Sequence, residues 1–145
     1  KGHDDLLDAL GEVLRVQRTW RLLWVGDGWW RERLVAKARA MGLGVRTLDR
    51  GGEADPDAQV VLTGLVPPER VPAMMRAMDV LAHPSYREGL PRTVPQALLC
   101  GVPVIAYDVD GTREACREGE TGRLVKPGDV AGLRRGVGRF GALLA

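Results

Sequence analysis

The residues best suited to chemistry lie in one loop, residues 84–91, which carries a single carboxylate, Glu88, directly before Gly89. An apolar run that predicts a strand precedes this loop, and a predicted helix begins near Thr93. Open α/β sheets build their ligand crevices at loops of this kind, which join the end of a strand to the start of a helix. We therefore expect Glu88 to lie at a binding edge.

An ionised Glu88 side chain offers two acceptor oxygens, which suit the adjacent hydroxyl groups of a sugar. Gly89 and the helix start near Thr93 add free backbone N–H groups and a positive helix end, which favour a phosphate or diphosphate. This combination predicts a ligand that carries both hydroxyl groups and negative charge. The candidate ionic partners of the carboxylate are Arg87, Arg92 and Arg113.

Structural interpretations of the same residues stay open. Thr93 and Gln96 have the Thr-x-x-Gln spacing of a capping box, in which Gln96 would only return a hydrogen bond to the cap. The Gly pair in Gly26-Asp27-Gly28 could do no more than allow a tight turn. His83, before a proline at a predicted strand end, is expected to make a local hydrogen bond and is not assigned to the catalytic group.

Strands and helices alternate along the chain and would position these loops. The predicted strands are short apolar runs at residues 22–25, 60–62, 80–82, 104–106 and 124–125. The predicted helices begin near Asp4, Trp29, Pro67, Thr93, Thr112 and Asp129. Alternation with short turns predicts the α/β class, with a parallel sheet covered by helices on both faces. The loops after the strands should then share one edge.

The 145 residues contain no repeat, low-complexity tract or linker, so we expect a single domain over residues 1–145. Residues 51–57 are rich in turn formers and predict a mobile surface insertion. The chain begins at Lys1 without a methionine. We therefore expect it to be a piece of a longer protein.

Charge and composition exclude several classes of partner. The net charge of +2 comes from 21 basic and 19 acidic residues mixed along the chain, which argues against nucleic acid. No apolar run reaches the roughly 18 residues of a membrane span, and no signal pattern opens the chain. Cys100 and Cys116 lack metal-ligand spacing and are expected to be reduced thiols in a cytoplasmic protein.

Six segments, in their order and spacing, resemble the C-terminal domain of retaining glycosyltransferases of family 4. They are Gly26-Asp27-Gly28 and residues 61–67, 78–80, 84–89, 100–104 and 120–125. Enzymes of that family have two Rossmann-like domains facing across a cleft, the GT-B arrangement, and the C-terminal one holds the nucleotide-sugar donor. The resemblance implies one half of such an enzyme, a Rossmann-like domain whose first strand and N-terminal acceptor domain lie upstream of residue 1.

The resemblance also implies roles for single residues. Glu88 matches the first acid of the family's Glu-x7-Glu motif, which contacts donor-sugar hydroxyl groups, and is the expected catalytic residue. Gln96 stands at the second acid, which normally accepts hydrogen bonds from the ribose. A neutral amide should weaken ribose binding by about tenfold, because hydrogen bonds to charged groups are the stronger ones. The other expected donor-binding residues are Lys1, Gly26, Gly64, Leu65, Val66, Gly89, Leu90 and Arg92.

Some of these positions match particular parts of the family's donor site. Lys1 matches the lysine of its pyrophosphate-binding Arg/Lys pair, and residues 64–66 match the loop whose backbone meets the nucleobase. Asp110-Gly111 matches a Gly-Gly turn that faces the cleft. Pro91 stands where many family members have glycine and removes one N–H donor, so we hypothesise that Arg92 supplies replacement charge.

The expected activity is transfer of a sugar from a nucleotide-diphosphate sugar to an acceptor with retention of configuration. No metal ion and no cofactor are expected, and the acceptor would be a glycan or a lipid-linked group. In the full-length enzyme the location would be cytoplasmic or peripheral to the inner membrane. The alternatives are a GT-B sugar-nucleotide epimerase and a non-catalytic nucleotide- or glycan-binding module, which Gln96 keeps open. A flavodoxin-like receiver would need an acidic cluster at the end of its first strand.

Overall fold

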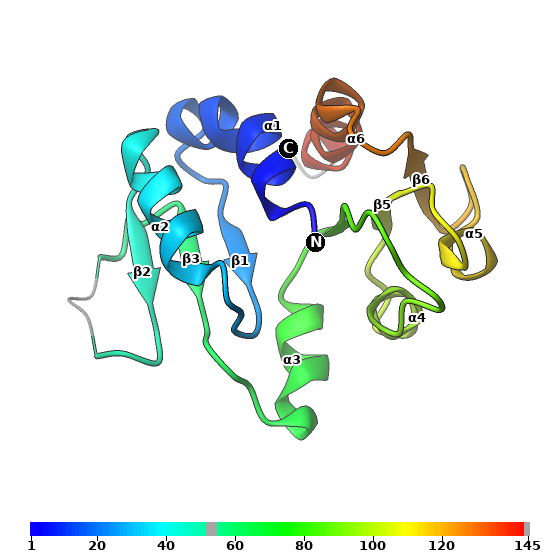
Figure 1. The fold of residues 1–145 in the computed structure, drawn as a ribbon, viewed down its shortest axis with the longest axis horizontal. Helices are drawn as coiled ribbons and strands as arrows, with labels where there is room; N and C mark the ends of the chain where they lie inside the picture. The colour runs from blue at the N-terminus through cyan, green and yellow to red at the C-terminus, as the bar shows by residue number, and fades with distance from the viewer. Residues whose placement is uncertain (52–54, 144–145) are drawn as a thin grey trace. The chain divides into compact units, whose positions relative to one another are not determined.

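The computed structural model describes residues 1–51 and 55–143, in which helices and strands alternate (Figure 1). The helices are α1 (His3–Val16), α2 (Arg31–Ala40), the 3-10 helix η1 (Pro68–Arg70), α3 (Val71–Arg76), α4 (Thr93–Leu99), α5 (Thr112–Ala115) and α6 (Val130–Leu143). The strands are β1 (Leu22–Trp24), β2 (Val45–Thr47), β3 (Val60–Leu62), β4 (Leu81–His83), β5 (Val104–Tyr107) and β6 (Gly122–Val125). Every predicted strand and helix is present, and β2 is an addition. Part of the predicted surface insertion, residues 52–54, lies outside the described residues.

The chain divides into two compact units, and each is described here by itself. The first unit is Lys1–Ala9 with Val71–Ala145, and the second is Leu10–Arg70. Each contains a three-stranded sheet whose strands all run parallel, in the order β4-β5-β6 in the first unit and β1-β3-β2 in the second. The α/β class with parallel strands is confirmed, with the strands divided between two sheets. The single domain over residues 1–145 stays a prediction.

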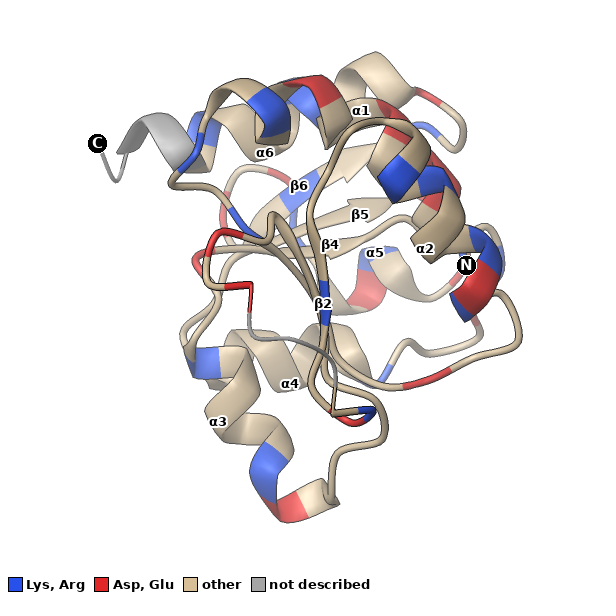
Figure 2. Ribbon diagram, turned by 90° about the vertical axis from the view of Figure 1, so that its left-hand side faces the viewer, with Lys and Arg blue, Asp and Glu red and all other residues tan. Residues whose placement is uncertain are grey.

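In the first unit, β5 is the central strand and forms the middle of the core. All four of its residues are buried, as expected for a parallel strand covered on both faces. Helix α6 packs against β5 and β6 on one face, and α4 packs against β4 and β5 on the other (Figures 1 and 2). A cluster of buried residues lies on the α4 side and consists of Met75, Val94, Ala97, Val102, Val104, Ala106 and Cys116.

In the second unit, an ion pair ties together the loops that follow the strands. Arg31 opens α2 with a side chain only 5% exposed, and it donates two hydrogen bonds to the Asp49 carboxylate, at 2.7 and 2.5 Å. Asp27, after β1, lies 3.5 Å from the same guanidinium. The Asp49 carboxylate occupies the space where a Cβ atom of Gly64 would lie, and Gly64 has a φ of +69°. Glycine is therefore required at this turn after β3 for two reasons.

Charged residues of both signs are distributed along the ribbon, and neither sign is confined to one part of it (Figure 2). Within residues 1–51 and 55–143, no helix is both long enough and apolar enough to cross a membrane. Cys100 and Cys116 are free thiols, as the sequence predicts.

Replacing Asp49 by Asn is expected to lower the free energy of unfolding, because Arg31 would lose the charge that compensates its burial. The matched control is Glu32→Gln, which removes an exposed ion pair with Arg50, 2.6 Å long, and should change stability by less than about 1 kcal/mol. Urea unfolding measures both, and equal losses in the two variants would contradict the assignment.

The same ion pair predicts a pH dependence. The hydrogen bond from Arg31 holds the pKa of Asp49 below its usual value, against the smaller effect of burial. The stabilisation by Asp49 should be complete above the usual aspartate pKa of about 4 and should disappear as the pH falls through the lower value of the folded protein. Urea unfolding at several pH values measures this effect. The difference in the free energy of unfolding between wild type and Asp49→Asn should decrease as the pH falls.

Two glycine substitutions test the packing of the first unit. A Cβ atom at Gly122, the first residue of β6, would collide with the Val104 carbonyl oxygen and lie 2.7 Å from Cys116 Sγ. Gly122→Ala should therefore lower the thermal midpoint. Gly138, in α6, has no atom within 4 Å of its would-be Cβ. Gly138→Ala should stabilise the protein by up to about 1 kcal/mol through helix propensity. An unchanged thermal midpoint in Gly122→Ala would contradict the close approach of β6 to Val104.

Candidate functional site

The loop that carries Glu88 folds back onto the strand that precedes it. The Ser85 N–H donates to the carbonyl of His83, the last residue of β4, at 2.9 Å. The Pro84 carbonyl accepts a hydrogen bond of 2.8 Å from the N–H of Gly2. A Cβ atom at Gly2 would collide with this carbonyl oxygen, so the close approach requires glycine. The loop is thereby anchored to both β4 and the start of the chain.

The Glu88 carboxylate lies between two basic side chains. Its Oε1 atom forms an ion pair with Lys1 Nζ, and His83 Nε2 lies 3.3 Å from the same oxygen. The Glu88 side chain is 14% exposed, whereas that of Lys1 is 58% exposed. Burial raises the pKa of Glu88, but the hydrogen bonds from Lys1 and Ser85 and the positive charge of Lys1 outweigh this effect, so the net shift is downward. Glu88 is therefore an ionised acceptor at neutral pH.

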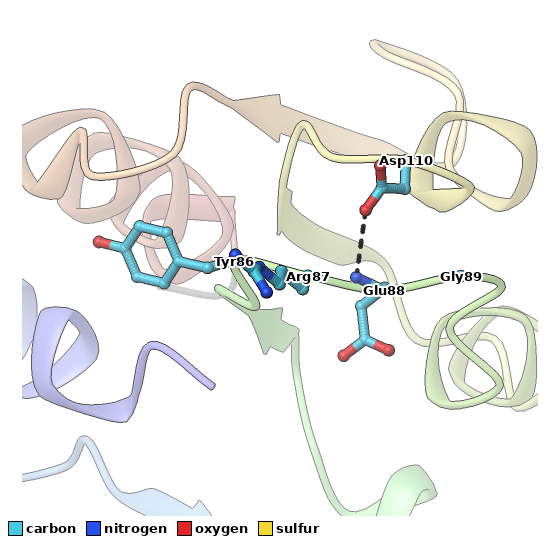
Figure 3. Close-up of a pocket in the computed structure, with 5 residues that line it drawn as sticks. All are labelled: Tyr86, Arg87, Glu88, Gly89 and Asp110. Carbon is cyan, nitrogen blue, oxygen red and sulfur yellow. Dashed lines mark hydrogen bonds between the residues drawn. The ribbon is translucent and has the colours of Figure 1, made fainter.

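The backbone of Glu88 and Gly89 is joined to the loop after β5. The Glu88 N–H donates to Asp110 Oδ2 at 3.4 Å, and the Gly111 N–H donates to the Gly89 carbonyl at 3.0 Å (Figure 3). Asp110 has a φ of +37°, a conformation that glycine adopts more easily. The Glu88 side chain projects from the opposite side of the loop to Asp110 (Figure 3). The carboxylate therefore stays free of the contacts that hold its backbone.

A hollow of about 760 Å³ lies over this loop. It is lined by Tyr86, Arg87, Glu88, Gly89 and Asp110 (Figure 3). The backbone N–H groups of Gly89 and Leu90 donate to no other described residue. A Cβ atom at Gly89 would have open space around it, so the backbone is accessible there. An ionised acceptor next to free N–H donors suits a ligand that has both hydroxyl groups and negative charge.

A half-buried carboxylate fixes the start of the same loop. Asp5 of α1 accepts hydrogen bonds from the hydroxyl of Tyr86 and from that of Tyr107, the latter 2.6 Å long. The two rings meet edge to face with their centroids 5.3 Å apart. The hydrogen bond to Asp5 raises the pKa of Tyr86, and burial raises that of Tyr107. Both tyrosines are therefore neutral hydrogen-bond donors.

The capping-box interpretation of Gln96 is wrong. Arg92 precedes α4 with helical angles, φ −59° and ψ −31°, and no side chain caps the helix. Thr93 is therefore inside the helix and not at the extended position that a capping hydroxyl requires. Gln96 is exposed on α4 and has no hydrogen bond from its side chain to another described residue. Its amide is available to a ligand.

The structure brings together some of the predicted residues of the first unit. Lys1 contacts Glu88, and Gly89 lines the same hollow. Leu90, Arg92 and Gln96 are exposed and follow along the chain without lining it. The prediction that Arg87, Arg92 or Arg113 pairs with Glu88 is wrong, because Lys1 forms that ion pair. Arg113 instead pairs with Asp108.

The remaining predicted residues belong to the second unit. The N–H of Gly26 donates to the Gly64 carbonyl at 3.0 Å and lies 3.2 Å from the hydroxyl oxygen of Thr63. The structure thus joins the loops after β1 and β3. Leu65 is 83% exposed, and Val66 is half-buried. These positions leave the loop after β3 accessible.

Sequence reasoning missed three contributors to the site: Tyr86, Asp110 as a backbone anchor, and His83 as a neighbour of Glu88. Nε2 of His83 lies 3.3 Å from Glu88 Oε1, and the local hydrogen bond expected of this histidine stays a prediction. Asp108 and Asp110 have Asp-x-Asp spacing, but Asp108 binds Arg113 and Asp110 binds the Glu88 backbone. In the described part of the chain, no group of three or more potential ligands could hold a metal ion.

Comparison with known proteins identifies the family of the chain. Residues 1–140 match the family model of glycosyl transferases group 1. The 2-deoxystreptamine glucosyltransferase of Streptomyces kanamyceticus is 35% identical over 139 residues, which are 96% of this chain and 33% of that protein. The chain therefore spans about a third of this relative's length.

Solved structures give the same result. HepE of Anabaena, in complex with UDP, has a TM-score of 0.70 at 26% identity and is matched over 99% of this chain and 35% of its own. The C-terminal domain of a glycosyl transferase group 1 protein of Francisella tularensis has a TM-score of 0.78 at 21% identity, over 98% of this chain and 69% of its own. The expected Rossmann-like fold is thus confirmed, and the chain belongs to the family of glycosyl transferases group 1.

Proposed function

We propose that residues 1–145 are the donor-binding half of a retaining glycosyltransferase of the GT-B type, which transfers a sugar from a nucleotide-diphosphate sugar. The observation that supports this most is the ionised Glu88 carboxylate beside the free N–H groups of Gly89 and Leu90, in a chain of this family. The Anabaena neighbour has been solved both with UDP and with UDP-glucose.

In this proposal, Glu88 accepts hydrogen bonds from hydroxyl groups of the donor sugar and orients its anomeric carbon. The N–H groups of Gly89 and Leu90 face the diphosphate, where negative charge develops as the leaving group departs. Preorganised donors of this kind stabilise a transition state because they need no reorganisation during the reaction. Lys1 leaves Glu88 and pairs with the diphosphate, which its exposed side chain allows.

Two further residues complete the proposed donor site in the first unit. Arg92 is exposed and forms no ion pair with a described residue. Its positive charge can therefore compensate for the backbone N–H donor that Pro91 lacks. Gln96 accepts a hydrogen bond from the ribose through its amide oxygen. This bond is weaker than one to a carboxylate.

The other parts of the proposal concern the rest of the protein. Gly26 and the loop of Gly64, Leu65 and Val66 contribute the nucleobase side of the donor site. An N-terminal domain of the full-length protein provides the acceptor site, for a glycan or a lipid-linked group. The full-length protein acts in the cytoplasm or at the inner surface of the inner membrane.

Glu88→Gln in the full-length protein should lower kcat/KM for sugar transfer by roughly 10- to 100-fold, since a hydrogen bond to a charged group contributes about 1.5–3 kcal/mol. The control is Glu69→Gln, which removes an exposed carboxylate of η1 and should leave the rate unchanged. Product analysis by mass spectrometry measures transfer. Normal rates in Glu88→Gln would remove this residue from its role, and an epimerised donor would favour the epimerase.

Gln96→Glu should increase affinity for the nucleoside diphosphate by about tenfold, because a carboxylate replaces a neutral acceptor for the ribose. Gln96→Ala is the matched control and should weaken binding. Isothermal titration calorimetry measures both. Equal affinities in wild type and the two variants would mean that this position does not contact the ribose.

A second candidate function is a binding module without catalysis. Tight nucleotide binding by the full-length protein without any sugar transfer would support it.

A further inference from the structure

His83 lies next to Glu88 in space, five positions apart in sequence. It is the last residue of β4, where it pairs with Ala106 of β5. Its side chain is 11% exposed, and Nε2 is buried without a well-aligned hydrogen-bond partner in the described part of the chain. Glu88 Oε1 lies 3.3 Å from this nitrogen. A buried polar atom without a partner is costly, so this arrangement calls for an explanation.

We propose that His83 is a positioning residue, which donates a hydrogen bond from Nε2 to Glu88 Oε1 when the bound donor draws Lys1 away. The proposal deepens the proposed function and rests on it. In the absence of a ligand, Lys1 and His83 share the same oxygen. Once Lys1 pairs with the diphosphate, the half-buried Glu88 carboxylate loses its charged partner and keeps only neutral ones, Ser85 and His83.

The two basic side chains differ in mobility. Lys1 is 58% exposed and can turn toward a ligand, whereas His83 is fixed by the β4 ladder and by packing. A shift of a few tenths of an ångström would bring Nε2 to normal hydrogen-bond distance from Oε1. The second carboxylate oxygen then remains free for the sugar. His83 thereby keeps the orientation of Glu88 that donor binding requires.

The protonation state of His83 is compatible with this role. Burial lowers its pKa, the Glu88 carboxylate opposes this, and the positive charges of Lys1 and His3 act in the same direction as burial. The net shift is downward, so the imidazole is neutral at neutral pH. A neutral imidazole with its proton on Nε2 is a hydrogen-bond donor, and the bond to Glu88 selects this tautomer.

Two variants of the full-length protein separate this role from simple packing. His83→Gln keeps an N–H donor near the place of Nε2, and His83→Leu fills the volume without a donor. His83→Leu should lower kcat/KM for the nucleotide sugar by about tenfold, and His83→Gln should retain most of the activity. Both should bind the nucleoside diphosphate without sugar as wild type does, because His83 acts through Glu88. Equal losses in the two variants would overturn the proposal.

A double-mutant cycle adds a stricter criterion. In a Glu88→Ala background, His83→Leu should cause no further loss, since the group it positions is already absent. A loss that persists in this background would show that His83 supports packing alone.

A second measurement is independent of enzymatic activity. ¹⁵N NMR of the His83 ring in the full-length protein should show the proton on Nε2, and Glu88→Ala should lower the His83 pKa further. If the wild type transfers no sugar from any nucleotide sugar, the proposed function fails, and this titration still decides whether the two residues are coupled. A proton on Nδ1, or a pKa unaffected by Glu88→Ala, would overturn the inference.

Discussion

The carboxylate of Glu88 has to be ionised, partly buried and free to meet a ligand, and these requirements compete. Burial opposes the charge, and the structure offsets this with Lys1 and His83 on one carboxylate oxygen. The backbone of the same residue is held by Asp110 from the other side. Because the backbone and the side chain have separate partners, a ligand can replace Lys1 without releasing the loop.

The two units use a similar arrangement to hold their loops. In the first, Gly2 and Gly111 bring backbone segments so close that a Cβ atom would collide with a carbonyl oxygen. In the second, the Asp49 carboxylate lies where a Cβ atom of Gly64 would be. Close approach of this kind fixes the loops after the strands without large side chains. Their backbone N–H groups and exposed side chains remain accessible to a ligand.

The sequence predicted the elements whose residues carry strong local signals. β5 was predicted from its apolar run, because a strand buried on both faces shows no alternation. β2 was missed because Val45, Arg46 and Thr47 are only half-buried, with a charged residue in the middle. The capping box failed because the backbone before Thr93 is already helical, which residue types alone do not reveal.

The sequence predicts the acidic residue of the site, Glu88, but not the residues that surround it. Glu88 and Gly89 follow from loop chemistry and from the family motif. The Lys1 partner lies 87 positions away in sequence, and the Asp5–Tyr107 hydrogen bond joins residues 102 positions apart. Contacts between residues so far apart in sequence produce no periodic pattern. They depend on the packing of the whole unit. His83 was assigned a local role because its nearness to Glu88 depends on how a proline-containing loop folds back.

The central claim is that Glu88 and the free amides beside it hold a sugar attached to a nucleoside diphosphate. Calorimetric titration of the full-length protein with UDP, GDP and ADP, each with and without a sugar, tests it most directly. The account predicts that one of these sugar conjugates binds more tightly than its bare nucleotide, and that Glu88→Ala abolishes this difference. Absence of binding by all of them at millimolar concentration, or a difference that persists in Glu88→Ala, would contradict it.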